Sequence, residues 1–123
     1  MSPSRRGLLH DTFQGLTELQ ARIQDHARRS DHLQREIARL ERQGTTAARP
    51  HWRAGRYLYL VHPQRDGRRR REYVGVNPTR VARALYQVER WERVQALRAE
   101  LAELEDQLRH IAARLPGTSA SIW

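Results

Sequence analysis

Arginine and tyrosine side chains are interleaved in one stretch of the sequence, residues 49–83. The planar guanidinium group of arginine binds phosphate through paired N–H donors, and arginine and tyrosine both stack on nucleic-acid bases. These residue types together indicate contact with a nucleic acid. The candidate nucleic-acid-binding residues are Arg53, Arg56, Tyr57, Tyr59, Arg65, Arg68, Arg69, Arg70, Arg71, Tyr73, Arg80 and Arg83.

Positive charge is concentrated in the same stretch. The chain has a formal net charge of +9, and all 23 of its Lys and Arg residues are arginine. Residues 49–83 hold ten arginines against Asp66 and Glu72, a net charge of +8, whereas the rest of the chain contributes only +1. A basic field confined to one segment predicts a polyanionic partner, and we expect DNA rather than RNA.

Two structural explanations for these residues stay open. The tyrosines can serve as cross-strand packing partners, and the run Arg68–Arg71 can protect the edge of a sheet against aggregation. Four consecutive arginines exceed what edge protection requires, and Arg80 and Arg83 extend the basic stretch further along the chain. We therefore assign a packing role to one face of the predicted strands and a binding role to the other.

Residues that support catalysis or metal binding do not form a recognisable motif. Most carboxylates stand three or four positions from an arginine, which is typical of solvated pairs on one helix. The six histidines form no H-x-x-x-H or H-E-x-x-H pattern, and the chain has no cysteine and no glycine-rich phosphate loop. We expect a protein that is not an enzyme and that uses no metal and no cofactor.

A β-hairpin is predicted over residues 49–76. Two runs rich in aromatic and β-branched residues are separated there by Asp66-Gly67, a dipeptide typical of a two-residue hairpin turn. Alternation along an extended second strand would place Arg69 and Arg71 on the same face.

Heptad seams, in which apolar residues recur at steps of three and four, lie on both sides of this hairpin. The first predicted helix, residues 12–43, has the seam Leu16, Leu19, Ile23, His26, Ser30, Leu33, Ile37 and Leu40. The second, residues 77–115, has the seam Val81, Leu85, Val88, Trp91, Val94, Leu97, Leu101, Leu104, Leu108, Ile111 and Leu115. Gly44 suits the end of the first helix, Asn77-Pro78 suits the start of the second, and residues 116–123 are a tail.

The predicted fold is mainly α and forms a single domain. Two long helices pair as an antiparallel coiled coil and carry the small basic β-hairpin at one tip. We expect a homodimer that forms a four-helix bundle, because a single helix pair buries little apolar surface.

No apolar run reaches the roughly 18 residues of a membrane span, and the amino terminus lacks a signal-peptide core. We therefore expect a cytoplasmic protein without membrane contact.

Residues 55–91 resemble a family of short uncharacterised coiled-coil proteins with a basic, tyrosine-rich β-hairpin, encoded near transposons and plasmids. The matching pieces are Gly55-Arg56-Tyr57-Leu58-Tyr59-Leu60, Asp66-Gly67-Arg68, Arg71-Glu72-Tyr73-Val74 and the helical segment Tyr86–Trp91. Family members often carry cysteines before the first strand, and this chain has none, so a metal function does not transfer. The hairpin is also similar to the DNA-binding sheets of phage-type integrases. The resemblance implies DNA and mobile elements, and it implies nothing about catalysis.

Three functional hypotheses follow from these observations. The leading one is a non-catalytic DNA-binding accessory protein of a mobile element or plasmid, with a recombinase or transposase as its protein partner. The second is a coiled-coil adaptor whose basic hairpin binds an acidic protein surface. The third is an RNA-binding protein, for which stacking on tyrosine carries more of the binding.

Overall fold

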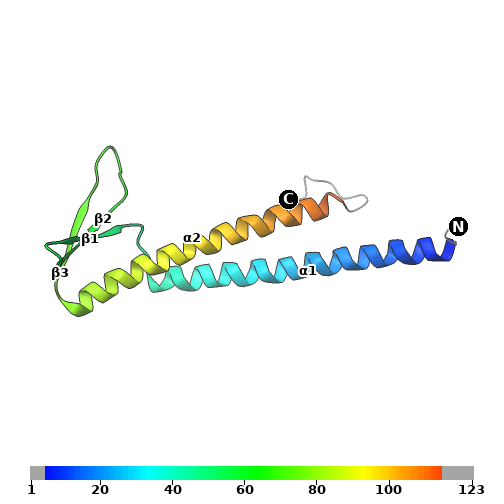
Figure 1. Cartoon of the computed structure of the whole chain (residues 1–123), viewed down its shortest axis with the longest axis horizontal. Helices are drawn as coiled ribbons and strands as arrows, with labels where there is room; N and C mark the ends of the chain where they lie inside the picture. The colour runs from blue at the N-terminus through cyan, green and yellow to red at the C-terminus, as the bar shows by residue number, and fades with distance from the viewer. Residues whose placement is uncertain (1–4, 115–123) are drawn as a thin grey trace. The chain divides into compact units, whose positions relative to one another are not determined.

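The computed structural model describes residues 5–114. They form two long helices and a small antiparallel sheet, in the order α1 (Arg5–Gln43), β1 (Arg49–Arg53), β2 (Tyr57–Val61), β3 (Arg71–Gly75) and α2 (Pro78–Ala112) (Figure 1). The predicted mainly helical fold with a small β element is confirmed. Helix α1 begins at Arg5, earlier than the predicted residue 12, and Leu115 and the predicted tail 116–123 lie outside the described residues.

Two compact units make up the described part of the chain. One contains residues 5–34 and 99–114, and the other contains residues 35–98, including the whole sheet. Each unit therefore holds one segment of α1 and one segment of α2. Neither of the described helices contains a stretch apolar enough to cross a membrane.

The heptad seam of α1 is the least exposed stripe of that helix. Leu33, Ile37 and Leu40 are buried, and the five earlier seam residues are half-buried. Residues between the seam positions are almost all exposed. The seam of α2 follows the same rule from Val81 to Ile111, where every seam residue is buried or half-buried. The structure thus confirms both predicted seams, with alternating steps of three and four in α1 and four consecutive steps of three between Leu85 and Leu97 of α2.

Within the first unit, the two helix segments run antiparallel. Arg29 in α1 donates to Glu100 in α2 with 2.7 Å between Nη2 and Oε1, and His26 pairs with Gln107. Residue numbers therefore rise along α1 as their partners' numbers fall along α2. The polar seam residue His26 has two partners, because its Nδ1 lies 2.8 Å from the Arg22 carbonyl and its Nε2 lies 2.8 Å from the Gln107 side-chain amide.

Within the second unit, the sheet packs against the first turns of α2. Leu58 and Leu60 of β2 are 0% and 3% exposed, and they form one buried cluster with Ala48, Ala84 and Val88. Three partly buried residues, Val74, Val81 and Leu85, complete this core. The inward face of the sheet is thus the packing face, as alternation along β2 predicts.

The sheet has three strands in the order β1-β2-β3, and both neighbouring pairs are antiparallel. The sequence predicts only two clear strands, so β1 corrects that prediction. Its residues include Pro50, which cannot donate to a ladder and is tolerated because β1 is an edge strand. Ala54, Gly55 and Arg56 connect β1 to β2. Ala54 and Gly55 have φ angles of 53° and 68°, and the Arg56 amide donates to the Arg53 carbonyl, which closes a tight turn over these two residues.

The predicted turn at Asp66-Gly67 is confirmed. Asp66 and Gly67 have φ angles of 51° and 75°, and the flanking residues Arg65 and Arg68 exchange two backbone hydrogen bonds of 2.9 Å. Strand β3 begins only at Arg71, however, so Arg68, Arg69 and Arg70 lie in the connection before it. Strict alternation therefore does not extend back to Arg69, so the shared face of Arg69 and Arg71 no longer follows from strand geometry and stays a prediction.

Candidate nucleic-acid interface

The sheet has an outer face, opposite the packing face, on which every residue except Val61 is aromatic or basic. Directly opposed residues of an antiparallel pair share a face. Tyr59 pairs with His51 on one side and with Tyr73 on the other, so the three side chains form a row across the sheet. We define the outer face by this register, and its residues are Arg49, His51, Arg53, Tyr57, Tyr59, Val61, Arg71 and Tyr73.

Aromatic rings occupy the middle of the outer face. The rings of Tyr59 and Tyr73 are 5.1 Å apart between centroids and tilted by 52°, a favourable arrangement for an aromatic pair. Tyr73 is 57% exposed, whereas Tyr59 is half-buried. The guanidinium carbon of Arg56, in the β1–β2 turn, lies 5.3 Å from the centroid of the Tyr57 ring and forms a cation–π contact.

The position of Tyr73 depends on a β-bulge next to it. Tyr59 opposes Tyr73, but Leu58 opposes Gly75, so Val74 is an extra residue on β3. Gly75 has a φ of 101°, a conformation that favours glycine. A Cβ added to Gly75 would lie 3.6 Å from two ring carbons and the hydroxyl oxygen of Tyr73. The ring therefore lies against the backbone at Gly75, and its exposed surface faces solvent.

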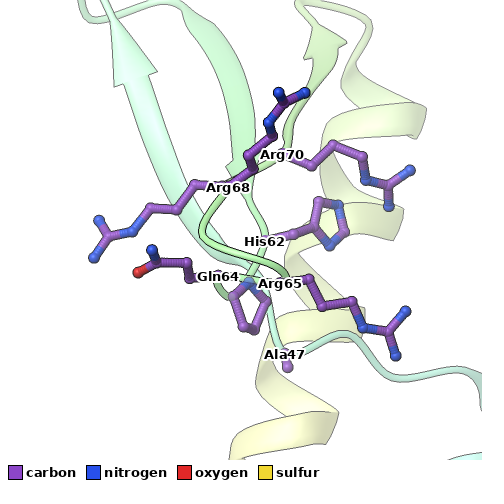
Figure 2. Close-up of a pocket in the computed structure, with 8 residues that line it drawn as sticks. Ala47, His62, Gln64, Arg65, Arg68 and Arg70 are labelled. Atoms are coloured by element: carbon purple, nitrogen blue, oxygen red, sulfur yellow. The ribbon is translucent and has the colours of Figure 1, made fainter.

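The connection between β2 and β3 is the second basic feature. A hollow of about 920 Å³ is lined there by Arg65, Arg68, Arg69 and Arg70 together with His62. All four arginines are exposed, and Figure 2 shows the guanidinium groups of Arg65, Arg68 and Arg70 apart from one another. Separated guanidinium groups suit an extended ligand with several phosphates better than a single small anion.

The two carboxylates of this region do not neutralise the outer face. Glu72 opposes Leu60 on the packing face, and its Oε2 lies 3.1 Å from Nε2 of His62. Asp66 lies in the turn between Arg65 and Arg68. No ion pair holds any of the candidate arginines within residues 5–114, whereas helix arginines such as Arg29 and Arg98 pair with Glu100 and Glu41.

The structure divides the sequence-predicted residues into three groups. Arg53, Tyr57, Tyr59, Arg71 and Tyr73 share the outer face with Arg56 at its edge. Arg65, Arg68, Arg69 and Arg70 line the hollow of the β2–β3 connection. Arg80 and Arg83 lie on the first turns of α2, where Arg83 lines a separate shallow groove with Tyr86.

Three members of the outer face, Arg49, His51 and Val61, are absent from the sequence-predicted site. The signal that could have found Arg49 and His51 is the spacing of Arg49, His51 and Arg53, which alternate ahead of the Ala54-Gly55 turn. Among residues 5–114, no group of three or more histidines or carboxylates is arranged to hold a metal ion.

A comparison with protein-family models, curated proteins and solved structures finds no match for this chain.

Proposed function

We propose that this protein is a non-catalytic nucleic-acid-binding protein, with DNA as the favoured partner, that binds through its three-stranded sheet. The observation that supports this proposal most strongly is the composition of the outer face. Arginines at positions 49, 53 and 71 surround the aromatic row, and the register places no carboxylate among them. The arginines of the β2–β3 connection supply further phosphate contacts beside the same sheet.

The arginines of the outer face and of the β2–β3 connection lack a carboxylate partner in the described residues, and this argues for an external anionic partner. Several helix arginines form exposed ion pairs with carboxylates. Within the described residues, the arginines of the outer face and of the β2–β3 connection form no such pair. Clustered cations repel one another, so the arrangement costs stability unless an anionic ligand compensates for it. Phosphate groups of a nucleic acid provide that compensation and release bound counterions.

The proposal includes a cellular role. The resemblance to mobile-element proteins supports an accessory role beside a recombinase or transposase in the cytoplasm.

The proposal also includes a homodimer. A homodimer would bury helix surface that one chain leaves exposed, including Ala96, Ala99 and Ala102 on α2. Sedimentation equilibrium tests the dimer directly. We expect Ala102→Arg to shift the mass to that of one chain, and a monomeric parent protein would contradict the dimer.

A binding series tests the proposed function. Fluorescence anisotropy is measured with labelled duplex DNA, single-stranded DNA and structured RNA from about 50 to 200 mM salt, with polyglutamate as a polyanion that lacks phosphate. We expect nucleic-acid binding whose logarithm falls linearly with the logarithm of salt concentration. If no nucleic acid binds at low salt, the proposal is wrong and the adaptor hypothesis takes its place. Equal competition by polyglutamate would also contradict it, because simple charge attraction would then explain the binding.

A further inference from the structure

We infer that the Tyr59–Tyr73 pair is a stacking platform for unpaired bases, so that the ligand is a single-stranded segment of DNA or RNA. This inference rests on the proposed function and specifies its ligand. Single-stranded DNA and single-stranded RNA share one chemistry, a planar base next to an anionic backbone. Aromatic rings on a sheet bind such bases by stacking.

The geometry of the pair supports stacking with solvent-accessible rings. Tyr73 lies beside the backbone at Gly75 and keeps 57% of its surface exposed. Tyr59 supports it from the neighbouring strand at a centroid distance of 5.1 Å. Because these two contacts limit its motion, the Tyr73 ring loses little further conformational freedom when a base stacks on its exposed surface.

The charges around the platform indicate how a strand would lie on it. Arg71 is two residues from Tyr73 on β3. Residues that are two positions apart in a strand point to the same face of the sheet. On the other side of the row, His51 of β1 stands between Arg49 and Arg53. A base over the tyrosines therefore has cations within reach on both sides for the flanking phosphates.

A duplex fits this arrangement less well than a single strand. Bases in a duplex are stacked on one another and offer only their edges in the grooves. His51, Tyr59 and Tyr73 place three planar rings in a row. Aromatic rings recognise the faces of unpaired bases rather than their edges. Pairing of Tyr59 with Tyr73 across the strands would also be expected of a purely structural contact. An experiment must therefore separate stacking from sheet stability.

The decisive ligand is an abasic oligonucleotide, which keeps the phosphates and lacks the bases. Binding of the full chain is measured at one salt concentration to oligothymidylate, oligouridylate, an abasic strand of the same length and a duplex. We expect one or both of the base-containing single strands to bind between about five-fold and about a hundred-fold tighter than the abasic strand. Comparison of oligothymidylate with oligouridylate then shows whether DNA or RNA is preferred.

Variants of two equally exposed tyrosines locate the effect. Tyr73 is 57% exposed on the sheet and Tyr86 is 58% exposed on α2. Tyr73→Ala should reduce binding of the base-containing strand to the level of the abasic strand and leave abasic binding unchanged. Tyr73→Phe, which keeps the ring, should retain binding, and Tyr86→Ala should behave as the parent protein.

The outcomes separate this inference from the proposed function. Equal binding of base-containing and abasic strands by the parent protein overturns stacking while nucleic-acid binding stands, and this comparison needs no variant to fold. Equal losses for both strands in Tyr73→Ala also overturn it, because the ring would then act only through the sheet. Absence of binding to every ligand at low salt overturns the proposed function itself.

Discussion

Arg90 of α2 donates a hydrogen bond from Nε to the backbone carbonyl of Gly44, with 2.6 Å between the two atoms. Its Nη2 also lies 3.2 Å from the carbonyl of Gln43, the last residue of α1. Gly44 has a φ of 102°, so the chain leaves the helix there in a conformation suited to glycine. The side chain of Arg90 thus satisfies carbonyls at the end of α1 and holds the start of the β1 connection against α2.

The first prediction concerns this contact. Arg90→Met keeps much of the aliphatic stem and removes the donors, so it should lower the free energy of unfolding by about 1.5–3 kcal/mol, the range for hydrogen bonds to charged groups. Urea unfolding followed by circular dichroism measures the loss. Arg93→Met on the exposed surface of the same helix is the matched control, and we expect a change within about 0.5 kcal/mol. Equal effects of the two substitutions would show that the cap is unimportant.

The second prediction concerns the bulge below Tyr73. Gly75→Ala forces a residue with a Cβ into a φ of 101° and should cost about 1–3 kcal/mol in thermal or urea unfolding. Gly67→Asn is the control, because Gly67 has a φ of 75°, asparagine tolerates that region and no atom lies within 4 Å of the added Cβ. We expect the control to cost only a few tenths of a kcal/mol. A Gly75→Ala protein as stable as the parent would exclude the bulge conformation.

The third prediction concerns the α1 seam. Leu33 is 1% exposed, so Leu33→Ala should lower the free energy of unfolding by about 2–5 kcal/mol through lost burial and an unfilled cavity. Leu9 lies on the same helix and is 70% exposed, so Leu9→Ala should change stability by less than about 0.5 kcal/mol. Denaturant melts of both variants provide the comparison. Similar losses at the two positions would place the seam elsewhere on the helix.

The two helices and the β2–β3 hairpin could be predicted from the sequence because each has a local signal. Apolar steps of three and four mark a seam whatever its partner is, and His26 and Ser30 keep that phase although they are polar. Asp66-Gly67 specifies its turn through the backbone conformations that those two residues tolerate. The opposed faces of β2 follow from alternation alone.

Other features depend on contacts that lie far apart in the sequence. Strand β1 contains Pro50 and lacks clear apolar alternation, so its pairing with β2 decides its structure. The bulge at Val74 and Gly75 appears only when β3 is aligned with β2. That alignment also decides which arginines lie on the outer face. Local patterns therefore found most of the site residues and could not sort them into their surfaces.

The central claim is that nucleic acid binds at the outer face and is not held by net charge alone. The most direct measurement compares two double variants of equal charge, Arg53→Gln with Arg71→Gln on the outer face and Arg22→Gln with Arg93→Gln on the helices. Binding of a labelled single strand is titrated across a salt series after circular dichroism shows that both variants are folded. We predict that the outer-face variant loses about ten-fold or more in affinity and that its log–log salt slope shrinks by about 1.4, or about 0.7 for each lost phosphate contact. The helix variant should keep the parent slope. Equal losses of affinity and slope in the two variants would contradict binding at the outer face.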